Sequence, residues 1–130
     1  MIGRVASLAG VLLTAGVGSA TAEGDPPFYG HWARGDGNAR IRIAPCGSEV
    51  CVTNTWIKPG TPGEKTGDRL IMQGNSDGAG KWLGTAFDPQ RNLRYKMTIN
   101  VANDQMTSDG CLLGGLVCKH MSWTRLGWAR

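Results

Sequence analysis

The sequence has no run of basic residues and no apolar segment long enough to cross a membrane. No two of its 14 Lys and Arg residues are adjacent and its net charge is only +4, so it contains no polybasic stripe of the kind that binds nucleic acid or anionic lipid. The main apolar stretch, residues 5–17, is shorter than the roughly 20 residues that span a bilayer. These absences exclude the commonest classes of nucleic-acid-binding and helical membrane proteins.

The N-terminal segment has the three parts of an export signal. Arg4 supplies the positive charge, residues 5–17 supply the apolar centre, and small residues follow at 19–22. The sequence therefore predicts a Sec-type signal-peptide helix over residues 1–22, with cleavage after Ala22 and delivery to the periplasm or the exterior. A retained membrane anchor is the alternative. The remaining chain, residues 23–130, has the length of one domain.

Export indicates that the four cysteines form disulfides, because small exported domains usually do so. No Cys-x-x-Cys pair suggests redox activity, and the spacing does not resemble a zinc site. Four cysteines allow three connectivities. The local pairs Cys46–Cys51 and Cys111–Cys118 are favoured because each brackets a glycine-containing turn.

Alternation of apolar and polar residues with a period of two dominates residues 23–130, and no segment has a convincing helical pattern. Turn residues interrupt the alternation at short intervals. About eight strands are predicted, and they lie within residues 29–33, 40–43, 50–56, 70–72, 82–87, 94–101, 105–108 and 119–126.

Short strands joined by tight turns predict an all-β fold, a small up-and-down antiparallel β-barrel. Closing the barrel removes the exposed edges that an open sheet would leave. A sandwich is the main alternative. Strands this short do not suit an outer-membrane barrel, whose strands need about 9–11 residues.

The two ends of the strand series carry a paired motif. Gly30-His31-Trp32 begins the first strand, and Trp123-Thr124-Arg125 lies in the last. This arrangement resembles the calycin (lipocalin-like) barrels, in which an Arg of the last strand covers the Trp of the first. A guanidinium stacked on an indole gains cation–π energy. The resemblance implies that Trp32 and Arg125 close one end of the barrel.

The chain also resembles the small exported bacterial proteins grouped as domain of unknown function 2147. The matching residues span about residues 30–126. They are Gly30-His31-Trp32, Ile43-Ala44-Pro45-Cys46-Gly47, Cys51, Trp82-Leu83-Gly84, Phe87-Asp88-Pro89, Tyr95, Gly110-Cys111, Cys118 and Trp123-Thr124-Arg125. The resemblance implies a periplasmic, lipocalin-like barrel and no established activity.

No catalytic or metal site is predicted, and no cofactor. His31 and His120 have the opposite parity to the neighbouring apolar residues and are expected to face outward. A catalytic pairing of His120 with Ser122 would need a third orienting group and a cleft. Residues 74–81 are rich in glycine but do not fit a phosphate-binding loop, because neither the spacing nor a following helix is present. The acidic residues lie mainly at turns, where capping explains them. The protein is expected not to be an enzyme.

Large apolar side chains recur at positions expected to face inward, and they either line a cavity or fill the barrel. The candidate ligand-binding residues are Trp56, Trp82, Tyr95, Met97 and Met121. The leading hypothesis is a barrel that binds a small, largely apolar molecule. One alternative is a filled barrel that acts as an envelope interaction module through its basic outer residues, Arg40, Arg42, Arg94 and Lys96. A hydrolase with an unrecognised site is the other.

Overall fold

The computed structural model describes residues 25–128, and these residues form eight strands and no helix. The strands are β1 (Gly30–Arg34), β2 (Ala39–Cys46), β3 (Glu49–Ile57), β4 (Arg69–Ser76), β5 (Lys81–Asp88), β6 (Leu93–Ala102), β7 (Gln105–Leu112) and β8 (Cys118–Gly127). The predicted signal helix and the cleavage site after Ala22 lie outside the described residues.

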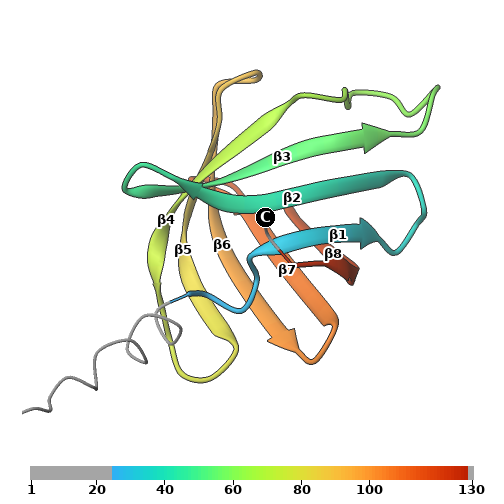
Figure 1. The fold of residues 1–130 in the computed structure, drawn as a ribbon. Coiled ribbons are helices and arrows are strands. Elements are labelled where there is room, and N and C mark those ends of the chain that lie inside the picture. Colours follow the sequence, from blue (N-terminus) through green and yellow to red (C-terminus); the bar gives the residue numbers. More distant parts are fainter. Residues whose placement is uncertain (1–24, 129–130) are drawn as a thin grey trace, which may run out of the picture.

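The strands form one closed barrel (Figure 1). Each strand pairs antiparallel with the next, and β8 pairs with β1 to complete the circle. The predicted all-β, eight-stranded up-and-down barrel is therefore confirmed. Closure satisfies the backbone hydrogen bonds that a free edge would leave open.

Most strands run further than the sequence pattern indicates, and the extensions at the C-terminal ends of β4 and β7 are the longest. β4 continues to Ser76 and β7 continues to Leu112. Both extensions pass through an inward-facing glycine, Gly74 in β4 and Gly110 in β7, and each glycine has a register partner on a neighbouring strand. Glycine weakens the sequence signal for a strand, so the pairing with neighbours decides these boundaries.

The alternation of strand direction gives the barrel two different ends. One end, here called the mouth, carries the loops 35–38, 58–68, 89–92 and 113–117. The other, here called the closed end, carries the turns 47–48, 77–80 and 103–104 together with residues 25–29. In Figure 1 the β4–β5 and β6–β7 turns mark the closed end, at the bottom of the view.

Aromatic side chains fill the closed end. Trp32 is fully buried, and its indole Nε1 donates a hydrogen bond to the carbonyl oxygen of Phe28 at 2.9 Å. The ring of Phe28 meets the ring of Trp82 edge-on, with centroids 5.6 Å apart. This end of the barrel is therefore closely packed.

Arg125 covers this aromatic plug. Its guanidinium lies 4.3 Å from the ring centre of Trp32 and 3.5 Å from that of Trp128. It also donates hydrogen bonds to the carbonyl oxygens of Tyr29 and Pro27, at 3.0 and 2.8 Å. The last strand is thereby tied to the segment that leads into the first.

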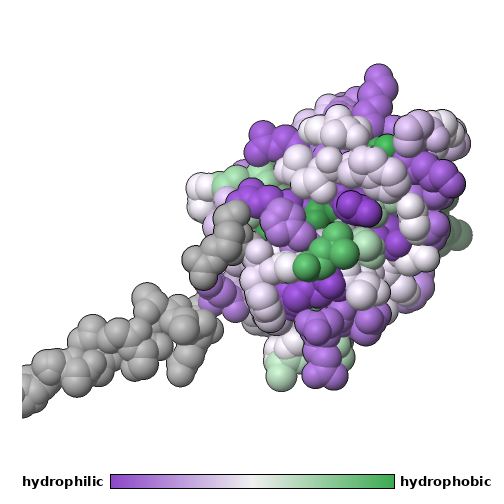
Figure 2. Space-filling model, turned by 45° about the vertical axis from the view of Figure 1, so that its right-hand side comes forward, coloured by the Kyte–Doolittle hydropathy of each residue, from purple (hydrophilic) through white to green (hydrophobic). Residues whose placement is uncertain are grey.

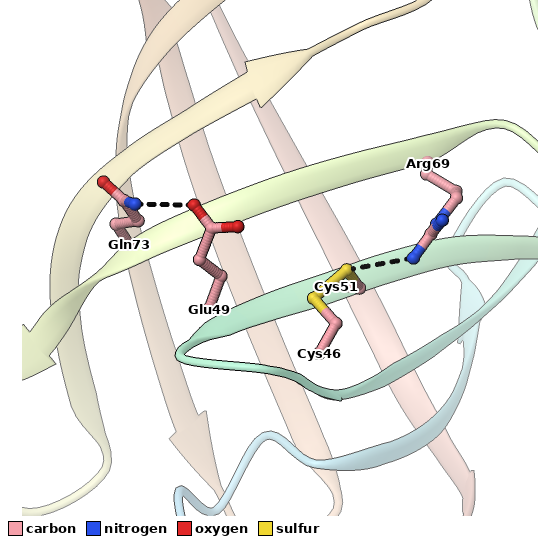
Figure 3. The surroundings of a disulfide bond; sticks show 5 residues. All are labelled: Cys46, Glu49, Cys51, Arg69 and Gln73. Atoms are coloured by element: carbon pink, nitrogen blue, oxygen red, sulfur yellow. Dashed lines mark hydrogen bonds between the residues drawn. A yellow bond between two sulfur atoms is a disulfide. The ribbon is translucent and has the colours of Figure 1, made fainter.

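Two disulfides join the local pairs Cys46–Cys51 and Cys111–Cys118. The first clips the β2–β3 hairpin and the second clips the base of the β7–β8 turn. Around the first, Arg69 Nη2 lies 3.3 Å from the Sγ atom of Cys51 (Figure 3). Both bonds fit a location outside the reducing cytosol.

Candidate functional site: a cavity at the mouth of the barrel

The mouth half of the barrel encloses a cavity of about 550 Å³ that is partly open to solvent. Its volume lies within the range of about 300–1,000 Å³ that is usual for small-molecule sites. The apolar side chains that line it are Val52, Pro62, Leu70, Leu93, Tyr95, Met97, Leu112, Val117, Met121 and Trp123. The barrel is thus filled at one end and hollow at the other.

The cavity exists partly because one inward position of β7 has no side chain. Gly110 faces Met97 across the β6–β7 ladder and lines the cavity. A Cβ atom at Gly110 would meet only the flexible end of the Met97 side chain, 2.8 Å from its Sδ, and then Tyr95 at 3.9 Å. A larger side chain therefore fits there once the flexible end of the Met97 side chain shifts.

Three of the five residues singled out from the sequence line the cavity: Tyr95, Met97 and Met121. Trp82 does not. Its indole lies in the plug at the closed end, against Phe28 and over Gly84. Trp82 faces inward as expected, but parity alone does not say how far along the barrel axis a ring will lie.

Trp56 was expected to face inward, and this prediction is wrong. Its side chain is 37% exposed on the outer surface, where the guanidinium of Arg40 lies 5.2 Å from its ring centre. The cause is a bulge in the β2–β3 ladder between Arg40 and Ile41, which pairs Arg40 with Trp56 but Ile41 with Asn54. The extra residue reverses the parity of the strand beyond it.

Several charged residues at the rim of the cavity pair with one another. Arg34 is only 8% exposed, and its Nη atoms contact the two carboxylate oxygens of Glu64 at 2.6 and 3.0 Å. Its Nε donates to the carboxylate of Asp36 at 3.0 Å. The hydrogen bond to Glu64 raises the pKa of Arg34, and the hydrogen bond from Arg34 lowers the pKa of Asp36. The long 58–68 loop is thereby tied to β1.

A second arginine ties the same loop to the β5–β6 turn. Arg91 Nη1 donates to the carboxylate of Asp88 at 2.8 Å, and Nη2 donates to the carbonyl oxygen of Gly63. Burial acts to raise the pKa of Asp88, but hydrogen bonds from Arg91 and Gln90 outweigh burial and hold that pKa below its usual range. Asp88 also accepts the backbone N–H groups of Gln90 and Arg91, as capping at a turn requires.

Replacing Asp88 by asparagine is expected to reduce the free energy of unfolding by about 1–2 kcal/mol at neutral pH, because the turn acceptor remains but the charge is lost. The pKa of Asp88 is lower in the folded chain than in the unfolded one. Its contribution is therefore complete above about pH 4, near the unfolded pKa of Asp, and disappears as the pH falls through the folded pKa. Urea denaturation at neutral and acidic pH measures the difference in free energy of unfolding between the native chain and the Asp88→Asn variant. A difference between Asp88→Asn and the native chain that stays constant with pH would contradict the assignment.

The sequence contains a signal for two of these rim residues. Arg34 has the parity of Trp32, and Asp88 has the parity of Trp82, so both are inward positions at the last residue of a strand. A charged residue at such a position indicates the rim of a barrel. Glu64 lies in a loop without periodicity, so no comparable signal exists for it.

His120 lies on the outer face, where its Nδ1 is 2.6 Å from a carboxylate oxygen of Asp109 on the paired strand. This pair was not anticipated, and it lies away from the cavity lining. Within residues 25–128, no group of three or more His, Cys, Asp or Glu side chains is arranged to hold a metal ion. That same stretch contains no helix long and apolar enough to cross a membrane.

Fold and cavity together define the class: a small closed antiparallel β-barrel, packed at one end and hollow at the other. The family model for an uncharacterised protein conserved in bacteria, domain of unknown function 2147, matches residues 30–125. The chain belongs to this family. No curated protein and no solved structure matches the chain, so no structural neighbour supports the expected likeness to calycin barrels.

Proposed function

We propose that this protein is a non-enzymatic binding protein that carries a small, largely apolar molecule in the cavity at the mouth of its barrel. The observation that carries the proposal is the half-open volume of about 550 Å³ lined by Tyr95, Met97 and Met121. Burial of apolar ligand surface against such side chains supplies the affinity.

Most of the rim charge is already paired, which supports a largely apolar ligand; the two other rim cations, Arg69 and Lys119, are in no ion pair among residues 25–128. Arg34 is already paired with Glu64 and Asp36, and Arg91 with Asp88. Charges that already satisfy one another gain little from a further charged group. A filled barrel acting only as an interaction module is disfavoured, because the aromatic plug occupies only the closed end.

The proposed location is the periplasm or the exterior. The support is the signal-like segment Met1–Ala22 in the sequence, together with the two disulfides, which are stable in an oxidising compartment.

Replacing Gly110 by leucine tests the cavity directly. The new side chain projects into the cavity beside Met97 and Tyr95, so the affinity for an apolar probe, N-phenyl-1-naphthylamine, is expected to fall about tenfold or more. A fluorescence titration of residues 23–130 measures this, since the closed barrel and its core lie within that stretch.

Thr107→Leu is the matched control, because Thr107 lies on the same strand with the opposite parity to the cavity-facing residues. It places the same leucine side chain outside the cavity and is expected to leave probe binding unchanged. Equal binding by the Gly110→Leu variant, with its fold intact by circular dichroism, would place the probe elsewhere and remove the support for the proposal.

A further inference from the structure

The β7–β8 turn exposes a group of aliphatic side chains at the mouth. Residues 112–117 read Leu-Leu-Gly-Gly-Leu-Val and carry no charge. Leu116 is 98% exposed, and Leu113 and Val117 are also exposed. We call residues 112–117 the apolar tip. On the face of the molecule shown in Figure 2, apolar side chains are sparse among polar ones, so an uncharged tip of this kind needs an explanation.

The tip is built as a firm hairpin. The disulfide Cys111–Cys118 closes its base. The amide N–H of Leu112 donates to the carbonyl of Val117 at 2.9 Å, and that of Leu113 donates to the carbonyl of Arg94 at 3.0 Å. Backbone groups that are already bonded cost less to move into an apolar phase, and a clipped turn has little conformational freedom left to lose.

Cations surround the base of the tip. Lys96 is the register partner of Cys111, Lys119 is the register partner of Gly110, and Arg94 bonds the tip through its backbone. All three side chains are exposed. None of the ion pairs found between residues 25 and 128 involves Arg94, Lys96 or Lys119. The rim acids, by contrast, are paired with Arg34 and Arg91.

We infer that the apolar tip docks on an anionic lipid surface, with its aliphatic side chains in the membrane interface and the three cations against the headgroups. The fluid acyl chains of a membrane adapt to the shape of whatever inserts among them, so three aliphatic side chains can bind there without a complementary pocket. A protein interface would favour aromatic or Arg anchors and a broader patch, which a narrow hairpin of Leu, Val and Gly does not offer. The positive charge at its base fits anionic headgroups.

Docking would bring the mouth to the membrane, because Leu112 and Val117 line the cavity as well as belonging to the tip. The inference does not depend on the proposed function. The Gly110→Leu variant leaves the tip unchanged, and its vesicle binding is expected to equal that of the native barrel even though probe binding is lost.

Vesicle co-sedimentation tests the docking. Residues 23–130 are used, because the apolar N-terminal segment would itself partition into lipid. Binding is expected to vesicles of phosphatidylcholine with phosphatidylglycerol, and to weaken in high salt. Leu116→Ser is expected to lower the partition coefficient about tenfold or more. Lys96→Gln is expected to lower it about fivefold on the anionic vesicles.

The controls lie at other exposed positions. Leu126→Ser removes an exposed leucine near the other end of β8, and Lys81→Gln removes a cation at the closed end. Both are expected to bind vesicles as the native barrel does. Absence of binding to anionic vesicles, or equal losses for Leu116→Ser and Leu126→Ser, overturns the inference. Self-association that Leu116→Ser abolishes, measured by light scattering without lipid, would make the tip a contact between copies instead and would also overturn it.

Discussion

Replacing Gly84 by leucine is expected to prevent the barrel from folding. Gly84 and Gly74 are register partners on β5 and β4. A Cβ atom at Gly84 would overlap the carbonyl oxygen of Gln73, lie 2.8 Å from the Cα of Gly74 and lie 2.5 Å from the ring of Trp82. Two of these three obstacles are backbone atoms of the neighbouring strand, which cannot move without breaking the ladder.

The expected loss is about 4 kcal/mol or more, a large fraction of the stability of a small domain. Far-ultraviolet circular dichroism and urea denaturation of the variant measure it. Gly110→Leu is the matched control, because Gly110 is also an inward glycine but faces only the flexible Met97 side chain. A Gly84→Leu variant as stable as Gly110→Leu would show that the two strands do not approach each other as described.

Replacing Arg125 by alanine is expected to lower the free energy of unfolding by about 3–5 kcal/mol. Arg125 is 4% exposed in its side chain, and it stacks on Trp32 while donating to the carbonyls of Tyr29 and Pro27. Hydrogen bonds from a charged group contribute about 1.5–3 kcal/mol, and a desolvated cation–π contact about 2. Losing them also frees the segment that carries Phe28.

Two further variants distinguish the stability that Arg125 gives to the aromatic plug from the stability gained by cation–π stacking on the surface. Arg40→Ala removes an exposed cation–π contact with Trp56 and is expected to cost less than about 1 kcal/mol. Arg125→Lys keeps the charge but loses the planar fork, so an intermediate loss is expected. Urea denaturation of the three variants measures their free energies of unfolding. If Arg125→Ala lowered the free energy of unfolding no more than Arg40→Ala does, Arg125 would not hold the closed end together.

The strand pattern and the closed barrel could be predicted because an eight-strand meander has few ways to bury its alternating face without leaving edges. The clearest case is β6, where Tyr95, Met97, Ile99 and Val101 alternate without interruption and the structure follows. The local disulfides could be favoured for a similar reason, since each closes a turn between neighbouring strands.

The site could be predicted only in part. The alternation that places Tyr95 and Met121 on the inner face gives no position along the barrel axis, so it does not distinguish cavity residues from Trp82 in the plug. The prediction that Trp56 faces inward is wrong because one extra residue at the β2–β3 bulge reverses the parity of the strand. Glu64 reaches Arg34 from a loop 30 residues away, a pairing that no local pattern encodes.

The most direct test of the account is native mass spectrometry of the protein isolated gently from the compartment where it resides. A barrel that carries an apolar molecule in its mouth cavity is expected to show a reproducible extra mass. That mass should disappear on denaturation and be absent from the Gly110→Leu variant. A bare polypeptide mass for the native protein, or an extra mass that the Gly110→Leu variant retains, would contradict a ligand held in this cavity.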